Sequence, residues 1–340
     1  MIRDAIARLV QGEDLAADDA YRAVTDIMGG EATPAQIGAF LALLRAKGET
    51  PAEISGSARA LRDHAVALAV AGDDLVDTCG TGGDGSGSVN VSTGAAIVAA
   101  AAGVRVAKHG NRSASSRCGS ADVLEALGVA LNLSPAAAVA CLDQVGLAFL
   151  FAPAFHPAMR HAAGPRRELG VRTVFNVIGP LSNPAGARRQ VVGVYEAALV
   201  PVVATALRDL GTLRAMVVHG SGGLDELSLA GPSLVAEVAD GEVRQYQVSP
   251  EDCGLGRADV AAVRGGDPAT NARLLTEALT GRPGPVRDIV VFNAGAALLV
   301  GGRATDLAGG VGLAAAAVDS GAARAKLDDL VAWSREARPA

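Results

Sequence analysis

The chain has 340 residues, half of them hydrophobic but only 3% aromatic, and a formal net charge of −6. This length is enough to bury a large core and predicts two domains of a globular protein rather than a disordered one. The acidic balance excludes an overall positive field that would draw the chain to nucleic acid or to an anionic membrane, although a local cationic pocket is compatible with it.

Cysteine spacing and hydropathy indicate in which cellular compartment the protein is expected and whether a membrane segment is expected. The N-terminal stretch MIRDAIARLVQGEDL places charges where a signal peptide needs an apolar run, and an apolar stretch such as 95–104 is about half as long as a membrane span. We therefore expect a cytoplasmic protein with reduced thiols and no membrane segment. The cysteines stand far apart and form no C-x-x-C pair: Cys79, Cys118, Cys141 and Cys253.

Two capping sequences mark helix starts near the N-terminus. Thr33 and Thr50 are each followed by proline and, three residues after the threonine, by Gln or Glu, the pattern of a capping box with proline at the first helical position. Between them, residues 37–48 carry apolar side chains at helical spacing and stop at Gly48. Residues 1 to about 68 are therefore predicted to be all-helical.

From residue 75 onward, short apolar runs alternate with helical stretches, one of which begins at Ser134-Pro135. This rhythm predicts an α/β fold with a mostly parallel central sheet and covering helices, next to the smaller all-helical N-terminal domain. The predicted strands are LVDTC (75–79), VRVAKHG (104–110), LAFLF (147–151), VVGVY (191–195), AMVVHG (215–220) and IVVFNAG (289–295).

A glycine-rich stretch, CGTGGDGSGSVNVST (79–93), follows the first predicted strand, where ligands bind in such sheets. Residues 80–85 match G-x-G-x-x-G, but a dinucleotide site also needs an acid at the end of the next strand, which reads VRVAKHG, and no P-loop pattern is present. The stretch is either an anion site or a tight turn without a ligand. Asp84 places a negative charge in the middle of it.

The next strand ends in Lys108, followed by amide and hydroxyl side chains. Lysine occurs only three times in the chain, at Lys47, Lys108 and Lys326. The use of lysine at position 108 therefore indicates that a compact ammonium is needed there rather than a guanidinium. The alternative is a polar turn that caps a helix beginning near Gly119. Two consecutive donor-rich loops favour a phosphorylated ligand.

Longer motifs extend over most of the chain: DTCGTGGDGSGSVNVST (77–93), KHGNRSASSRCGSADVLEALG (108–128), FHPAMRHAAGPRRELGVRTVFNVIGPLSNP (155–184) and HGSGGLDELSL (219–229), with the helical lead-in over 32–54. In these motifs the chain resembles the anthranilate phosphoribosyltransferase family of tryptophan biosynthesis, a branch of the nucleoside phosphorylase-like phosphoribosyltransferases. The resemblance covers nearly the whole chain and implies a helical domain over 1–68, joined by part of 155–190, and an α/β phosphoribosyl-binding domain over 69–340.

The resemblance implies transfer of the phosphoribosyl group of phosphoribosyl pyrophosphate to the anthranilate amine, with release of pyrophosphate. It implies Mg²⁺ as the cofactor, with two ions per active site, held by Ser92, Asp225 and Glu226, whose hard oxygens suit this ion. The residues implied in binding phosphoribosyl pyrophosphate are Gly80, Gly83, Asp84, Ser88, Asn90, Val91, Ser92, Thr93, Lys108, His109, Gly110, Asn111, Arg112, Ser113, Ala114, Ser115, Ser116 and Ser120.

For the acceptor, the resemblance implies that Arg166 binds the anthranilate carboxylate, with Gly80 and Asn111 lining the same site. A guanidinium suits a carboxylate because it can donate two parallel hydrogen bonds. Arg167 is expected on the helix surface, and His156 is either an acceptor-channel residue or a packed loop histidine. An aromatic amine is neutral at pH 7, so neither a strong general base nor a covalent nucleophile is expected, and the cysteines carry no chemistry.

Other functions stay open at this point. The Asp225-Glu226 pair alone is most often an inert surface feature, and its place in a glycine-flanked loop after a strand argues for a role. Pyrimidine nucleoside phosphorylases share the architecture but use inorganic phosphate and a nucleoside, and non-catalytic relatives that bind nucleic acid should have a basic groove and lack the acidic pair. The expected partners are thus the two small substrates and, as in the resembling family, a second copy in a homodimer through the N-terminal helices.

Overall fold

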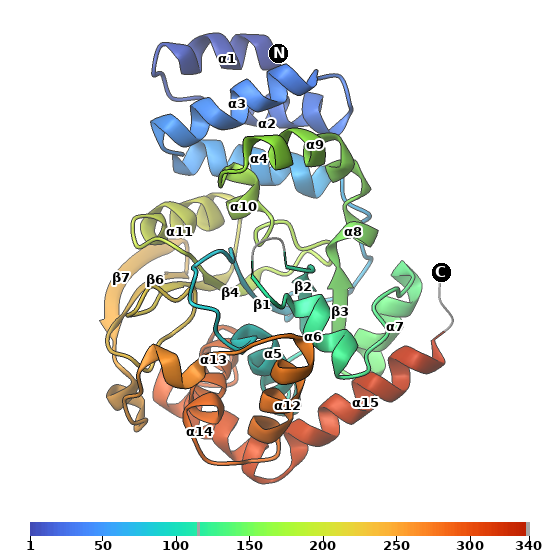
Figure 1. Cartoon of the computed structure of the whole chain (residues 1–340), viewed down its shortest axis with the longest axis vertical. Helices are drawn as coiled ribbons and strands as arrows, with labels where there is room; N and C mark the ends of the chain where they lie inside the picture. The colour runs from blue at the N-terminus through green and yellow to red at the C-terminus, as the bar shows by residue number, and fades with distance from the viewer. Residues whose placement is uncertain (114–115, 338–340) are drawn as a thin grey trace.

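The computed structural model describes residues 1–113 and 116–337, and it has two parts (Figure 1). A helical unit lies at one end of the long axis, and a sheet with its covering helices forms the rest of the molecule. This arrangement confirms the predicted combination of a mostly parallel α/β sheet with a smaller helical part at the N-terminus.

The helical unit is built from the first four helices together with two short helices from the middle of the chain. Thr33 and Thr50 each form the predicted capping box, and Gly48 ends the intervening helix with a positive φ. Packing of the later helices against the earlier ones places residues near 160–178 beside the N-terminal segment. The helices are α1 (Ile2–Val10), α2 (Ala17–Met28), α3 (Pro34–Lys47), α4 (Pro51–Asp63), α9 (Arg160–Leu169) and α10 (Val174–Ile178).

The sheet has seven strands in the order β3-β2-β1-β4-β5-β6-β7. The pairs among β1 to β5 are parallel, and β6 and β7 add an antiparallel hairpin at one edge. The carboxyl ends of the parallel strands therefore meet at one side of the sheet, which is where ligands are expected. The strands are β1 (Val76–Gly80), β2 (Val106–Gly110), β3 (Leu147–Phe151), β4 (Arg189–Gly193), β5 (Arg214–His219), β6 (Ser233–Ala239) and β7 (Glu242–Val248).

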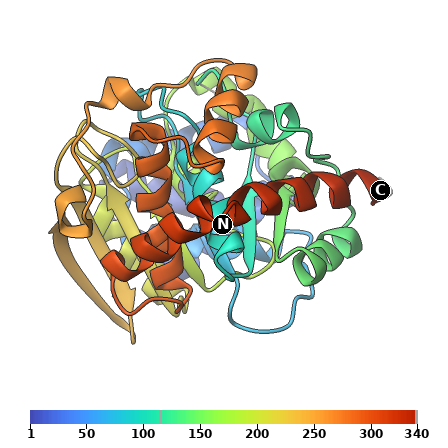
Figure 2. The ribbon, with the colours of Figure 1, turned by 90° about the horizontal axis from the view of Figure 1, so that it is seen from below.

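Helices cover both faces of the sheet and enclose two apolar cores. One core packs α11 and the helical unit against Val192 and Val217, and the other packs α5 and α13 against Val191 and Met216, because successive strand residues point to opposite faces. Figure 2, seen from below, shows the last helices crossing in front of the sheet, with α15, drawn in red, leading to the C-terminus. The helices outside the helical unit are α5 (Val91–Ala101), α6 (Ser120–Ala126), α7 (Pro135–Gln144), α8 (Ala152–Phe155), α11 (Leu199–Asp209), α12 (Pro268–Leu279), α13 (Pro285–Val300), α14 (Leu307–Asp319) and α15 (Ala322–Glu336), with short 3₁₀ turns at Pro157–Met159, Pro250–Cys253 and Val260–Val263.

One predicted strand is wrong. Residues 289–295 lie inside α13, which begins with Pro285 at its first position, and all residues from Ile289 to Val300 are buried. A helix buried on every side has a continuous apolar sequence, which periodicity cannot tell from a buried strand. The hairpin of β6 and β7 was not predicted.

Within residues 1–113 and 116–337, no helix is both long enough and apolar enough to cross a bilayer.

Candidate active site

The glycine-rich loop leaves β1 at Gly80 and reaches α5 through a series of tight turns. Gly82, Gly83, Gly85 and Gly87 all have positive φ between 62° and 77°, a region that favours glycine. Gly80 itself lies so close to the Asp225 carboxylate that a Cβ atom there would overlap with it. Glycines are therefore required here both by the backbone conformation and by the close approach of a neighbouring acid.

Asp84 holds this loop in shape. Its carboxylate accepts hydrogen bonds from the backbone N–H of Ser86 at 3.1 Å and from the Ser86 hydroxyl at 2.7 Å. It also accepts a longer hydrogen bond from the backbone N–H of Asp225, at 3.4 Å. The negative charge in the glycine-rich stretch thus ties the loop to itself and to the segment that follows β5.

Asp225 and Glu226 come from that segment and face the glycine-rich loop and the start of α5. Asp225 Oδ2 accepts a hydrogen bond from the backbone N–H of Gly82 at 2.7 Å, and Glu226 Oε1 accepts one from the backbone N–H of Ser92 at 3.0 Å. Burial, helped by the charge of Asp84, raises the pKa of Asp225 to about 7, and burial together with Asp225 raises the pKa of Glu226 well above its usual range. A cation placed here would be favoured by all three carboxylates.

Lys108, at 3% exposure, supplies the positive charge of this cluster. Its Nζ donates to the Thr78 carbonyl oxygen at 2.5 Å and to the Ser92 hydroxyl at 3.3 Å, and burial lowers the pKa of the ammonium. Asp77, whose pKa burial raises to about 6, lies on the other side of β1 and accepts from the backbone N–H of His109 at 3.1 Å. Lys108 thus supplies a positive charge in a site that contains several carboxylates.

Residues at the start of α5 divide into buried and accessible ones. Val91 and Thr93 are buried, at 0% and 1% exposure. Ser88, Asn90 and Ser92 are partly exposed. The structure therefore brings these three polar side chains, Lys108 and the acidic pair to one side of the sheet.

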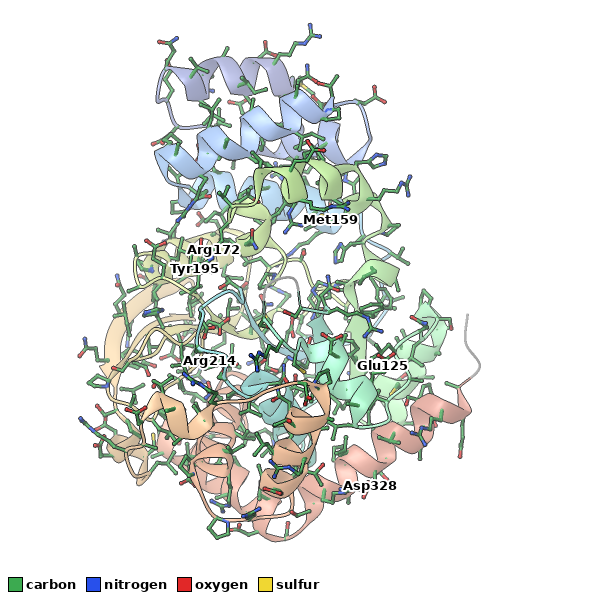
Figure 3. All side chains as sticks on the ribbon, in the orientation of Figure 1. Glu125, Met159, Arg172, Tyr195, Arg214 and Asp328 are labelled. Atoms are coloured by element: carbon green, nitrogen blue, oxygen red, sulfur yellow. The ribbon has the colours of Figure 1, made fainter. Side chains whose placement is uncertain are left out.

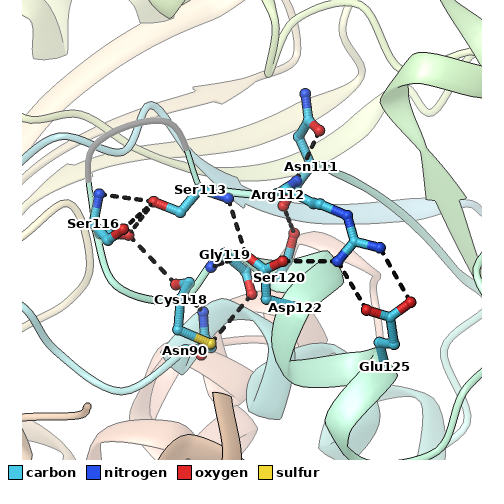
Figure 4. A network of polar contacts seen from close by, with 10 residues as sticks. All are labelled: Asn90, Asn111, Arg112, Ser113, Ser116, Cys118, Gly119, Ser120, Asp122 and Glu125. Atoms are coloured by element: carbon cyan, nitrogen blue, oxygen red, sulfur yellow. Dashed lines mark hydrogen bonds and ion pairs between the residues drawn. The ribbon is translucent and has the colours of Figure 1, made fainter. Parts of the chain in front are cut away.

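The segment after β2 forms a network of polar contacts over α6 (Figure 4). Arg112 pairs with Asp122 and Glu125, both at 2.9 Å, and Asp122 Oδ2 accepts from the backbone N–H groups of Ser113 and Gly119 at 3.1 and 2.8 Å. Because its guanidinium is held by two carboxylates, Arg112 is engaged within the protein.

Serine side chains in and next to the segment after β2 also form hydrogen bonds within the protein. The Ser113 hydroxyl donates to the Ser116 carbonyl oxygen at 2.7 Å, and the Ser120 hydroxyl donates to the Asn111 carbonyl oxygen at 3.2 Å. A Cβ at Gly110 would overlap with the Ser120 hydroxyl, so the end of β2 and the start of α6 are in close contact. Ala114 and Ser115, predicted to bind phosphoribosyl pyrophosphate, lie outside the described residues.

Arg166 lies on α9, one of the helices of the helical unit. Its guanidinium is partly buried, lies over the Phe175 ring at 5.4 Å from the centroid, and forms no ion pair with an acid in the ranges 1–113 and 116–337. Burial lowers the pKa of this group. Its neighbour Arg167 is exposed, as predicted. A partly desolvated arginine without an acidic partner is suited to bind a carboxylate from a ligand.

His156 and His109 form a buried pair with ring centroids 5.0 Å apart. Neither ring nitrogen of His156 has a hydrogen-bond partner within the described residues. Burial lowers the pKa of His156 to about 4 and that of His109 to about 3, so both rings are neutral at pH 7. The packing of His156 favours the second of the two interpretations of this residue, a packed loop histidine.

Sequence reasoning missed Arg172, which contacts the glycine-rich loop. Its guanidinium donates to the Gly83 carbonyl oxygen and lies over the Tyr195 ring at 4.1 Å. Figure 3 shows Arg172 and Tyr195 together between the helical unit and the sheet. The residue follows Gly170, which ends α9 in the left-handed conformation, and the only signal for it was its place inside one of the longer motifs.

The side-chain donors around the acidic pair determine which metal ion this site could bind. Among the residues that the structure describes, no group of three or more His, Cys, Asp or Glu side chains forms a complete metal site. The pair Asp225 and Glu226, with the Ser92 hydroxyl, offers hard oxygen donors for part of a coordination shell. Such an incomplete set suits Mg²⁺, which commonly keeps waters and substrate phosphates among its ligands.

Comparisons with known proteins agree with this geometry. Residues 72–324 match the family described as "Glycosyl transferase family, a/b domain", and residues 3–65 match "Glycosyl transferase family, helical bundle domain". A relative named anthranilate phosphoribosyltransferase from Desulforudis audaxviator is 57% identical over 99% of this chain and 98% of its own length.

Solved structures resemble the whole chain as well. The crystal structure of anthranilate phosphoribosyltransferase from Thermus thermophilus has a TM-score of 0.93 and 47% identity, and covers 98% of this chain and 99% of its own. The Saccharomyces cerevisiae enzyme, in complex with phosphoribosyl pyrophosphate and Mg, has a TM-score of 0.89 and 26% identity, covering 98% of both chains. The same yeast protein has been solved with 4-fluoroanthranilate. With matches to both domain models and this near full-length similarity, the chain belongs to the glycosyl transferase family that includes the anthranilate phosphoribosyltransferases.

Proposed function

We propose that the chain is an anthranilate phosphoribosyltransferase, which transfers the phosphoribosyl group of phosphoribosyl pyrophosphate to the anthranilate amine and releases pyrophosphate. This is the second step of tryptophan synthesis from chorismate. The observation that carries the proposal is the meeting of a glycine-rich loop, a buried lysine and an acidic pair at the carboxyl ends of β1, β2 and β5. The relatives named above support the choice of reaction.

The cosubstrate site is proposed along the two loops that follow β1 and β2. Backbone N–H groups of a glycine-rich loop can approach a diphosphate closely, and Lys108 adds an ammonium near the Ser92 hydroxyl. Stabilising the negative charge that develops on the leaving pyrophosphate is the main contribution expected from these residues. The proposed contacts are Gly80, Gly83, Asp84, Ser88, Asn90, Val91, Ser92, Thr93, Lys108, His109, Gly110, Asn111, Arg112, Ser113, Ala114, Ser115, Ser116 and Ser120.

Mg²⁺ is the proposed cofactor, with Ser92, Asp225 and Glu226 as its protein ligands and two ions per site. The raised pKa values of the two acids support this assignment, because a bound cation would favour their charged forms. When bound, Mg²⁺ neutralises phosphate charge. The yeast relative solved with phosphoribosyl pyrophosphate and Mg supports the same cofactor.

The acceptor site is proposed at Arg166, with Gly80 and Asn111 beside it. The guanidinium would hold the carboxylate and so orient the neighbouring amine toward C1 of the ribose. Since the amine is neutral at pH 7, positioning and leaving-group stabilisation are sufficient, and no covalent intermediate is required. Burial raises the pKa of the Cys79 thiol well above its usual value, which argues against a nucleophilic role for it.

The remaining proposals concern organisation. We propose a helical domain over 1–68 joined by part of 155–190, supported by the packing of α9 and α10 on α3 and α4, and an α/β domain over 69–340. We also propose a homodimer through the N-terminal helices, where Val10 on α1 is 61% exposed. A cytoplasmic location agrees with the four unpaired cysteines.

A product assay tests the proposed reaction. The purified protein is offered phosphoribosyl pyrophosphate with anthranilate, and in parallel thymidine with inorganic phosphate. The proposal requires pyrophosphate from the first mixture and no free thymine from the second. Thymine release alone would identify a nucleoside phosphorylase, and no product from either mixture would contradict catalysis of this kind.

A further inference from the structure

Residues 263–265, from the C-terminal half of the chain, form backbone hydrogen bonds with the glycine-rich loop. These hydrogen bonds run from Val89 N–H to the Val263 carbonyl and from Gly265 N–H to the Gly87 carbonyl, both at 2.9 Å. Asp267 then caps α12 by accepting from the backbone N–H of Thr270 at 2.8 Å. The capped start of α12 fixes the position of Asn271 in its first turn.

Asn271 is buried at 1% exposure, and both ends of its side chain are used. Its Oδ1 accepts from the backbone N–H of Gly266 at 2.7 Å, and its Nδ2 donates to Asn90 Oδ1 at 2.8 Å. The contact with a backbone donor fixes which end of the amide is oxygen, so the Nδ2 group must face Asn90.

Asn90 in turn joins the two loops that follow β1 and β2. Its Nδ2 donates to the Cys118 carbonyl oxygen at 3.1 Å, and its Oδ1 also lies 3.4 Å from the Cys118 Sγ (Figure 4 shows Asn90 and Cys118). One Nδ2 proton remains for a ligand oxygen, since an amide nitrogen carries two. The direction of that proton depends on the rotamer that Asn271 imposes.

We propose that Asn271 is a positioning residue for phosphoribosyl pyrophosphate, acting through Asn90. By fixing the Asn90 amide between α12 and Cys118, Asn271 keeps the loops after β1 and β2 in a fixed position relative to each other. This inference rests on the proposed function, since it takes these loops to be the cosubstrate site. Asn271 itself, at 1% exposure, is too deeply buried to contact a ligand directly.

The substitution Asn271→Asp tests this with little change in shape. The aspartate keeps an acceptor for Gly266 N–H but places an oxygen against Asn90 Oδ1. A flip of the Asn90 amide would relieve that contact only by turning its oxygen toward the Cys118 carbonyl. When the aspartate is charged, Asn90 has no orientation that satisfies both neighbours. The lost hydrogen bond by itself corresponds to about a tenfold effect at most.

The expected result is a KM for phosphoribosyl pyrophosphate raised about five- to tenfold, with the KM for anthranilate changed less than about twofold. In an Asn90→Ala background, Asn271→Asp should add almost nothing, because the two residues act as one unit. Leu279→Ala, in the buried last turn of α12, is the control: it should lower the thermal midpoint and leave both KM values unchanged. If Asn271→Asp does not fold, Gly265→Ala replaces it, because its Cβ would press on the Asn271 amide.

Equal shifts in both KM values, or full additivity with Asn90→Ala, would overturn the proposal and leave Asn271 a structural residue. The parent protein is assayed first, so that absence of turnover counts against the proposed function alone. If the parent protein shows no turnover, calorimetric titration with inorganic pyrophosphate decides whether Asn271 is a positioning residue. Weaker binding to the Asn271→Asp variant than to the Leu279→Ala variant would support the proposal, and equal binding would overturn it.

Discussion

The Asp225 carboxylate accepts a hydrogen bond from the backbone N–H of Gly82 at 2.7 Å, across 143 positions of sequence. This contact joins the segment after β5 to the glycine-rich loop after β1, and the neighbouring Glu226 makes the equivalent contact with Ser92 at the start of α5. The acidic pair therefore shapes the loop as well as offering oxygen ligands. Substitutions that keep the shape but remove the charge separate these two roles.

The double substitution Asp225→Asn and Glu226→Gln should reduce Mg²⁺-dependent turnover by about a hundred- to a thousandfold, the usual effect of losing a group that stabilises charge in the transition state. The amides retain an oxygen for Gly82 and Ser92, and Lys108 keeps the charge of Asp77 nearby, so the variant should still fold. Asp328→Asn with Asp329→Asn, an exposed pair on α15, is the control. Near-parental turnover at limiting Mg²⁺ would reject the metal assignment.

Lys108→Arg should lower kcat/KM for phosphoribosyl pyrophosphate at least about tenfold, although the charge is kept. The ammonium fits between the Thr78 carbonyl and the Ser92 hydroxyl at 3% exposure, and a planar guanidinium is too large for that space. Steady-state kinetics with both substrates measure the effect. Lys326→Arg, which changes a lysine bound to the Val145 carbonyl, serves as the control. Unchanged kinetics for Lys108→Arg would make this lysine a turn residue.

Arg166→Ala should raise the KM for anthranilate about ten- to a hundredfold and change that for phosphoribosyl pyrophosphate little, since charge-assisted hydrogen bonds contribute about 1.5–3 kcal/mol each. Arg167→Ala, next to it and exposed, should behave as the parent. Aniline, a poor acceptor without a carboxylate, should lose little further activity in the Arg166→Ala variant. Equal losses for both substrates with a lower thermal midpoint would remove Arg166 from the acceptor site.

The buried histidine pair predicts a loss of stability in acid. Burial lowers the pKa of His156 in the folded chain to about 4, so between about pH 6.5 and 4 the unfolded chain binds the proton more readily. The free energy of unfolding should therefore fall as the pH falls through this window, by about 3 kcal/mol from His156.

Denaturant unfolding at several pH values tests this with His156→Phe, which keeps a ring but cannot be protonated. Its free energy of unfolding should depend less on pH between 6.5 and 4 than that of the parent protein. His64→Gln, at the end of α4, is the control for the loss of a histidine outside the pair. A profile for His156→Phe that parallels the parent's would contradict the assignment of a buried, neutral ring.

The sequence predicted the features that depend on local chemistry. The capping boxes at Thr33 and Thr50 and five of the strands are where their residues indicate, because caps and short apolar runs are read within a few positions. The parallel arrangement also explains why the loops after β1, β2 and β5 meet, since the carboxyl ends of these strands share one side of the sheet.

What the sequence did not predict depends on contacts between distant residues. Asn271 meets Asn90 across 181 positions, and Arg172 reaches Gly83 across 89, and neither belongs to a local pattern that marks such a contact. Residues 289–295 were predicted as a strand because burial on all sides removes the helical periodicity that would have identified α13. The residues that support the site are thus harder to predict than those that form it.

The most direct test of the site is a crystal structure of the protein with phosphoribosyl pyrophosphate, Mg²⁺ and a non-reactive anthranilate analogue. The account predicts the diphosphate against the glycine-rich loop and Lys108, metal density beside Ser92, Asp225 and Glu226, and the analogue's carboxylate on the Arg166 guanidinium. Diphosphate bound away from the carboxyl ends of β1 and β2, or an analogue carboxylate that does not contact Arg166, would contradict it.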